Sequence, residues 1–97
     1  MEKISVEPKV LEEIRQLARK YNVRKVILFG SRARGDYRRT SDIDLAIEGG
    51  DFERFALDVD EETSTLLKYD IVNLDKDMQQ ELRDSIKKEG KLIYEKI

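Results

Sequence analysis

The sequence predicts an α/β (α+β) fold, a small mixed sheet with helices packed on it, because helical and strand-like patterns of apolar residues alternate along the chain. Apolar residues recur at three- and four-residue steps in residues 10–21 and 52–67, as on the buried side of amphipathic helices. With 97 residues, we expect one domain over residues 1–97. Three short apolar runs have the length of buried strands: 26–29, 43–47 and 71–74.

The first half of the chain is expected to hold one long helix and two strands with a short helix between them. Pro8 suits the first turn of the long helix, and Asn22 ends it. Residues 23–29 are predicted as a strand, and residues 30–33 as a turn that opens a short helix. After a polar loop, residues 42–47 form the second predicted strand.

The second half is expected to add two helices and a third strand. Residues 52–67 carry the apolar stripe of a helix, and residues 69–74 have the pattern of a strand. Apolar residues at helical spacing over 78–86 predict another helix, with Gly90 as its C-cap. Residues 92–94 suit a last extended piece, so the helices and strands alternate to the end of the chain.

The sequence contains neither cysteine nor histidine, which excludes several kinds of site. A Ser-His-Asp triad, a cysteine nucleophile, a histidine general base and a structural zinc site each need residues that the chain lacks. Catalysis would have to rest on carboxylates, hydroxyls, Lys, Arg and bound metal. Because carboxylate oxygens and water are the ligands that magnesium prefers, the composition favours this ion.

The charge balance argues against a nucleic-acid-binding protein. The 19 basic and 21 acidic residues give a net charge of −2, so we expect no direct nucleic-acid binding. No apolar run approaches the roughly 20 residues of a membrane helix, and the first five residues lack a signal peptide's apolar stretch. We therefore expect a cytoplasmic protein without a membrane partner. Locally the balance differs, because segment 30–41 holds four basic residues against a single acid, Asp36: Arg32, Arg34, Arg38 and Arg39.

A glycine-serine turn and a pair of aspartates form the most informative pattern in the chain. Gly30 and Ser31 follow the apolar run 26–29, as a phosphate-binding turn follows a buried strand. Asp42 and Asp44 lie two residues apart, so on a strand their side chains project from one face. The alternate residues Ile43, Leu45 and Ile47 would then point into a core. This pattern indicates chemistry on a polyphosphate with a divalent metal, and nucleotidyl transfer is the first candidate.

These residues carry a resemblance to a known family. Gly30-Ser31, then Asp42-x-Asp44, then an acid on a later strand resembles the DNA polymerase β-like nucleotidyltransferase superfamily, and most closely its minimal nucleotidyltransferase (MNT) domains. In that family a Gly-Ser turn precedes a strand bearing Asp-x-Asp, and a third carboxylate sits on a neighbouring strand. The resemblance is most specific over residues 23–74, and it implies the polymerase β-like nucleotidyltransferase fold.

The resemblance also implies a reaction and its carboxylates. An acceptor hydroxyl attacks the α-phosphorus of a nucleoside triphosphate while pyrophosphate leaves. Two magnesium ions can stabilise both ends of that displacement. Asp42 and Asp44 would share the metals. Asp70 would bind the metal that lowers the pKa of the acceptor, and it could take the proton itself.

The resemblance further implies which residues would bind the nucleotide. Gly30 would permit close approach of the backbone, and the hydroxyl of Ser31 would hold the terminal phosphates. Arg34 would either contact phosphate or pin the loop. Two roles are open for the remaining basic residues of the segment, Arg32, Arg38 and Arg39. They would either contact the nucleotide or an acidic partner, or lie in solvent as loop charges.

By the same resemblance, the chain looks like the antitoxin of a toxin–antitoxin pair. MNT proteins are typically paired with a small helical HEPN protein, and some neutralise it by transferring AMP from ATP to a tyrosine. A chain of 97 residues leaves no room for a domain that holds the acceptor, so we expect the partner to provide it. The alternative is a nucleotide-binding module that turns nothing over and neutralises its HEPN partner sterically.

Overall fold

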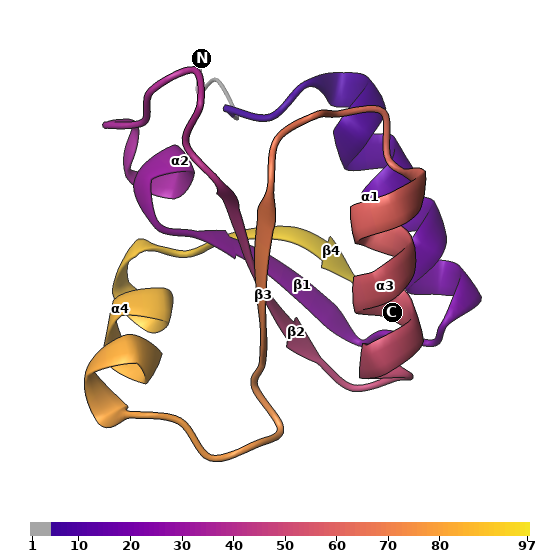
Figure 1. The fold of residues 1–97 in the computed structure, drawn as a ribbon. Coiled ribbons are helices and arrows are strands. Elements are labelled where there is room, and N and C mark those ends of the chain that lie inside the picture. The colour runs from indigo at the N-terminus through magenta and orange to yellow at the C-terminus, as the bar shows by residue number, and fades with distance from the viewer. Residues whose placement is uncertain (1–4) are drawn as a thin grey trace.

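A computed structural model describes residues 5–97, which form a four-stranded sheet with helices on both faces (Figure 1). The predicted order of elements is confirmed, and the last extended piece is a fourth strand. The elements are α1 (Pro8–Lys20), β1 (Lys25–Phe29), α2 (Ser31–Arg34), β2 (Ile43–Glu48), α3 (Phe52–Glu62), β3 (Tyr69–Asn73), α4 (Gln80–Glu89) and β4 (Lys91–Glu95).

The sheet is mixed, as the sequence predicts, with the strand order β3-β2-β1-β4. Strand β1 runs antiparallel to both β2 and β4, whereas β2 and β3 are parallel. Parallel neighbours need a crossover connection, and α3 provides it. This places β2 at the centre of the fold, with the β1–α2 turn on one side of it and β3 on the other.

The two faces of the sheet bury different sets of side chains. The helices α1 and α3 lie side by side over one face, and α4 lies over the other (Figure 1). On β2, Ile43, Leu45 and Ile47 are at most 1% exposed and pack in the core beneath α1 and α3, as predicted. The intervening Ala46 packs with Ile86 of α4. Because side chains alternate along a strand, Asp44 lies on the α4 face.

Helix α3 is shorter than the sequence predicts. It ends at Glu62, so residues 63–67, which carry the end of the predicted helical stripe, form a loop before β3. Thr63 is already extended, and its hydroxyl donates a hydrogen bond to the carbonyl of Val59 at 2.7 Å. The apolar spacing of this loop misled the prediction, because Leu67 packs against the core from an irregular segment while Leu66 is fully exposed.

Two strand boundaries also differ from the predicted ones. Strand β1 begins at Lys25, because the amide of Val23 instead donates to the carbonyl of Ala18 at the end of α1. Strand β2 begins at Ile43, so Asp42 lies in the loop immediately before it. Over residues 5–97, no helix is long and apolar enough to cross a membrane.

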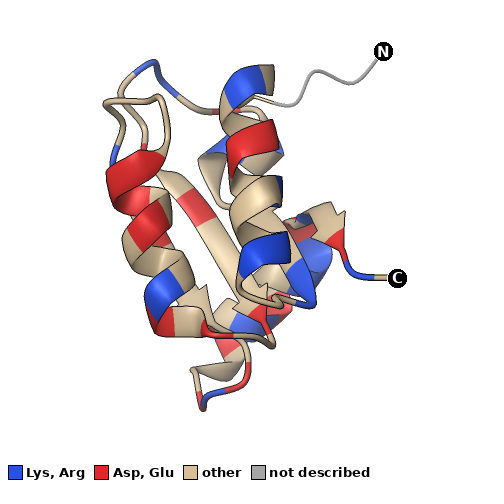
Figure 2. Cartoon of the chain, turned by 90° about the vertical axis from the view of Figure 1, so that its right-hand side faces the viewer, with Lys and Arg blue, Asp and Glu red and all other residues tan. Residues whose placement is uncertain are grey.

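Charge is distributed unevenly over the surface. Helix α3, residues 52–62, contains five acidic residues and one basic residue, and Figure 2 shows the acids along its length. This helix covers the sheet face opposite Asp44. The segment 34–39 carries three exposed arginines, Arg34, Arg38 and Arg39, and it lies shortly before the pair of aspartates.

Candidate active site

Gly30 forms the turn between β1 and α2, and Asp44 of β2 lies against it. The glycine has φ +73°, a conformation that residues with a Cβ rarely adopt. Its neighbour Phe29 pairs with Asp44 across the antiparallel strands, which brings the turn next to the carboxylate. A Cβ on Gly30 would come within 3.0 Å of the Asp44 carboxyl carbon. Glycine is therefore required at position 30 for the close approach of the Asp44 carboxylate, which is a candidate metal ligand.

The three predicted carboxylates lie in one electrostatic cluster. Asp44 and Asp70 are paired in register on the parallel strands β2 and β3, so their side chains share the α4 face. Asp44 is half-buried, whereas Asp42 and Asp70 are exposed. Burial raises the pKa of Asp44, and the negative charges of Asp70 and then Asp42 raise it further. The fold thus brings the three predicted carboxylates near one another, and Asp42 reaches the cluster from a loop.

This cluster suits a magnesium ion that shares its ligands with a substrate. Within residues 5–97, no three acidic side chains converge closely enough to hold a metal ion by themselves. Magnesium, however, is usually bound by one or two carboxylates together with water and substrate phosphates. Asp44 and Asp70 supply such a pair on adjacent strands, and their mutual repulsion is the condition that a cation relieves. The donor set therefore fits the metal that the sequence predicts.

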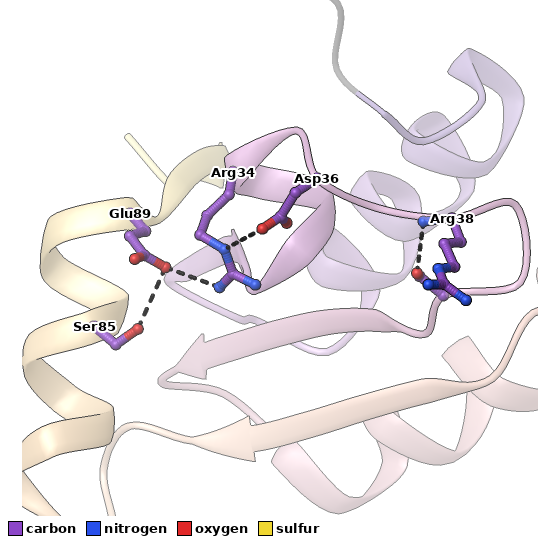
Figure 3. Close-up of polar contacts among 6 residues, drawn as sticks. Arg34, Asp36, Arg38, Ser85 and Glu89 are labelled. Atoms are coloured by element: carbon purple, nitrogen blue, oxygen red, sulfur yellow. Dashed lines mark hydrogen bonds and ion pairs between the residues drawn. The ribbon is translucent and has the colours of Figure 1, made fainter.

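Arg34 connects α2 to α4 (Figure 3). Its guanidinium contacts Glu89 at 3.1 Å and Asp36 at 3.3 Å, and these two bonds raise the pKa of Arg34. Its positive charge also acts on Asp44, whose pKa it lowers. Of the two roles left open by the sequence, loop pinning is the one observed. Ser31, half-buried, opens α2 on the same side of the site.

Arg32 is buried, so both roles predicted for it are wrong. Only 6% of the residue is exposed, and its guanidinium donates to backbone carbonyls instead of lying in solvent. No sequence signal could have found this role, because backbone acceptors look alike in every sequence. Arg38 and Arg39, in contrast, are exposed, as the solvated alternative had it.

A hollow of about 480 Å³ lies beside Asp42, on the side away from the β1–α2 turn. Leu66, at its edge, is fully exposed. The amide of Ile43 donates to the carbonyl of Lys68, which holds the 63–68 loop beside the start of β2. An exposed leucine is thus placed next to a candidate metal ligand. The hollow is lined by Thr40, Asp42, Leu66, Leu67 and Lys68.

The sheet is the one expected of a nucleotidyltransferase, and the comparison of sequences agrees. Residues 12–97 match the family described as "Polymerase beta, Nucleotidyltransferase", so the chain belongs to this family. The resemblance carried by the Gly-Ser turn and the Asp-x-Asp pair is thereby confirmed at the level of the family.

Two relatives come from the archaeon Methanocaldococcus jannaschii. The protein named "Putative protein adenylyltransferase MJ0604" is 45% identical over 69 residues, which cover 68% of this chain and 66% of that protein. The protein named "Putative protein adenylyltransferase MJ1215" is 42% identical over 48 residues, which cover 41% of this chain and 56% of that protein. The matches therefore span less than two thirds of the length of either relative.

Solved structures confirm the fold. A crystal structure of a toxin–antitoxin with AMP-PNP matches with a TM-score of 0.72 and 23% identity, covering 89% of this chain and 73% of that chain. A mutant of the toxin–antitoxin MntA-HpeT matches with a TM-score of 0.69 and 21% identity over the same shares. At these identities the similarity shows a common fold, and it agrees with the fold predicted from the sequence.

Proposed function

We propose that this chain is a magnesium-dependent protein adenylyltransferase that transfers AMP from ATP to a hydroxyl of a partner protein. The observation that carries the proposal is the position of Asp44, which lies between the charges of Asp70 and Asp42 and against the backbone of Gly30. A half-buried carboxylate with two acidic neighbours costs stability unless a cation joins it. Two relatives carry the name protein adenylyltransferase, which supports this choice among nucleotidyl transfers.

The reaction divides the work among the three carboxylates. Asp42, Asp44 and Asp70 would hold two magnesium ions, which supply charge stabilisation for the attacking and leaving oxygens. Asp70, on the edge strand β3, would accept the proton of the acceptor hydroxyl. A bond then forms between the acceptor oxygen and the α-phosphorus, and the bond from phosphorus to pyrophosphate breaks.

The nucleotide would bind between the β1–α2 turn and α4. Ser31 stands at the start of α2 for a hydrogen bond to a phosphate, and Gly30 leaves the backbone accessible. Arg34 would exchange Glu89 or Asp36 for a phosphate oxygen, since both partners are on the surface and hold it weakly. A structural neighbour that contains AMP-PNP supports a nucleoside triphosphate as the donor.

The acceptor would approach from the β3 side of the site. The hollow beside Asp42 lies there, and the exposed Leu66 offers an apolar contact for the side chain that carries the hydroxyl. Because two structural neighbours carry the name toxin–antitoxin, the partner we propose is a toxin, and by the resemblance in sequence a HEPN-type helical protein. The chain would then be the antitoxin.

The test is transfer of label from α-labelled ATP to the co-expressed partner in the presence of magnesium. Asp44→Asn and Asp42→Asn should each lower labelling by about a hundredfold or more, because each removes charge that acts on the transition state. Asp77→Asn is the matched control, since Asp77 is exposed and lies in the loop between β3 and α4. Neutralisation of the toxin that survives both site variants, with no label transferred by the wild type, would instead establish the steric binding module.

A further inference from the structure

Arg32 carries a buried positive charge that is satisfied by backbone carbonyls. The residue is 6% exposed, and over residues 5–97 it forms no ion pair with a carboxylate. Burying a guanidinium is costly unless its N–H groups find acceptors. The ring of Tyr37 covers it, with the guanidinium carbon 4.8 Å from the ring centroid. Because burying this charge is energetically unfavourable, its burial points to a role of Arg32 other than packing.

The carbonyls that Arg32 binds belong to two separate segments. Its Nη1 donates to Ser5 at 2.6 Å, in the segment before α1, and the hydroxyl of Ser5 donates back to the carbonyl of Arg32. Its Nε donates to Ser41 at 3.1 Å, and its Nη2 to Arg39 at 3.2 Å and Arg38 at 3.4 Å. A guanidinium can serve four carbonyls at once because it presents five donors in a fixed plane. Lysine has three donors on one atom and cannot.

The loop that Arg32 holds ends at a candidate metal ligand. Asp42 directly follows Ser41 and precedes β2, and the amide of the next residue, Ile43, donates to the carbonyl of Lys68 at 2.9 Å. The Ser41 hydroxyl accepts the amide of Arg38 at 2.8 Å (Figure 3), and the Ser41 amide donates to the carbonyl of Arg38 at 3.0 Å. Two peptide units flank Asp42: Arg32 holds the one before it, and the carbonyl of Lys68 holds the one after it.

We infer that Arg32 is a positioning residue that places Asp42 for metal binding. The inference rests on the proposed function, because it assumes that Asp42 is a metal ligand. Partners that orient metal ligands commonly change affinity by about 10- to 100-fold when they are lost. Loss of the Arg32 guanidinium should act in the same way, by letting the 38–41 backbone move and the carboxylate with it.

The test uses Arg32→Lys, which keeps the charge and removes the planar fork. Mn²⁺ binding is measured by electron paramagnetic resonance in the presence of AMP-PNP, so the readout needs no acceptor. We expect Arg32→Lys to weaken Mn²⁺ binding by about tenfold. Saturating metal should restore nucleotide turnover, which a merely structural defect would not allow. Arg39→Lys is the matched control, because only the backbone carbonyl of Arg39 contacts Arg32 and the side chain is exposed.

A second variant covers the case in which Arg32→Lys does not fold. Tyr37→Ala removes the ring over the guanidinium but leaves every donor, and Tyr37 is 42% exposed, so the fold should tolerate the change. We expect a smaller weakening of Mn²⁺ binding in the same direction. Wild-type Mn²⁺ binding in a folded Arg32→Lys protein, or in Tyr37→Ala if that variant alone folds, would overturn the inference.

The failure of this inference and the failure of the proposed function give different results. If Asp42→Asn weakens Mn²⁺ binding and folded Arg32→Lys does not, Asp42 is a metal ligand and Arg32 does not position it. If Asp42→Asn leaves Mn²⁺ binding unchanged, Asp42 is not a ligand, and the proposed function loses one of its carboxylates together with this inference.

Discussion

The carboxylate of Asp44 lies against the backbone of Gly30, where a side-chain carbon would come within 3.0 Å of the carboxyl carbon. This contact joins the β1–α2 turn to the centre of β2, and it makes the turn and the aspartate one site. A phosphate held at the turn would consequently lie next to the carboxylate that we propose as a metal ligand.

Replacing Gly30 by alanine should therefore damage both folding and function. The backbone at φ +73° is strained for any residue with a Cβ, which costs about 1–3 kcal/mol, and the methyl group would displace Asp44. Urea denaturation measures the first effect, and Mn²⁺ binding measures the second. Gly35→Ala is the matched control, because Gly35 has φ +97° but open space around it. Equal losses of metal binding in both variants would contradict the proposed contact.

Asp44→Asn should stabilise the metal-free protein while abolishing nucleotidyl transfer. The central carboxylate is half-buried and repelled by Asp70 and Asp42, so removing its charge relieves that repulsion. Thermal unfolding at neutral pH in a chelator should show a higher midpoint than the wild type. With magnesium and AMP-PNP, the difference between the two unfolding midpoints should shrink or change sign, since only the wild type is stabilised by the bound cation. A lower midpoint for Asp44→Asn in the chelator would show that the cluster is not under repulsion.

Substitution of the two partners in the Arg34–Glu89 ion pair should have different effects on nucleotide binding. Arg34→Gln should raise the KM for ATP several-fold, because a phosphate contact is lost. Glu89→Gln should leave that KM unchanged or lower it, because it frees the guanidinium from α4. Both variants should lose little stability, since the pair is on the surface. If both raise the KM equally, Arg34 acts only by pinning α2 to α4.

Leu66→Ser should weaken use of the acceptor and leave use of ATP intact. The side chain is fully exposed at the edge of the hollow beside Asp42, so its loss should not affect folding. We expect a rise of several-fold in the KM for the partner protein, with an unchanged KM for ATP. Leu92→Ser is the control, because Leu92 is also exposed but lies on β4, at the opposite edge of the sheet. The same effect from both leucines would show that the hollow is not the acceptor side.

Glu13→Gln should make stability less dependent on pH in the acidic range. Glu13 accepts hydrogen bonds from the amide and hydroxyl of Ser64 at 2.8 and 2.7 Å, and the hydrogen bond from the backbone amide is the main cause of the lowered pKa of Glu13. A carboxyl whose pKa is lowered by folding stabilises the folded state at pH values above its unfolded pKa of 4.5. This stabilisation is lost as the pH falls through the pKa of the folded state. The variant should thus be less stable than the wild type at pH 7 and similar in stronger acid. Unfolding midpoints across this range measure the difference, and a constant gap would contradict it.

Much of the fold could be predicted because the pattern of apolar residues repeats what the sheet and helices require. Alternation at Ile43, Leu45 and Ile47 gave the buried face of β2, and these side chains are buried under α1 and α3. The prediction of α3 extended too far because Leu67 is apolar at a helical spacing, although it packs from a loop. Spacing shows which residues are buried, but it does not show where Thr63 stops the helix.

The candidate site divides in the same way. The sequence alone determined which chemistry to expect, because a chain without histidine or cysteine is left with carboxylates, hydroxyls, Lys, Arg and bound metal, and Asp42 and Asp44 stand two residues apart after a Gly-Ser turn. The tertiary structure decided which groups meet: Asp70 comes beside Asp44 through the parallel pairing of β2 and β3, and Arg32 turns inward to bind the loop before Asp42. The physical reason is that both relations depend on backbone hydrogen bonds between distant segments, and backbone donors and acceptors are the same at nearly every position of a sequence.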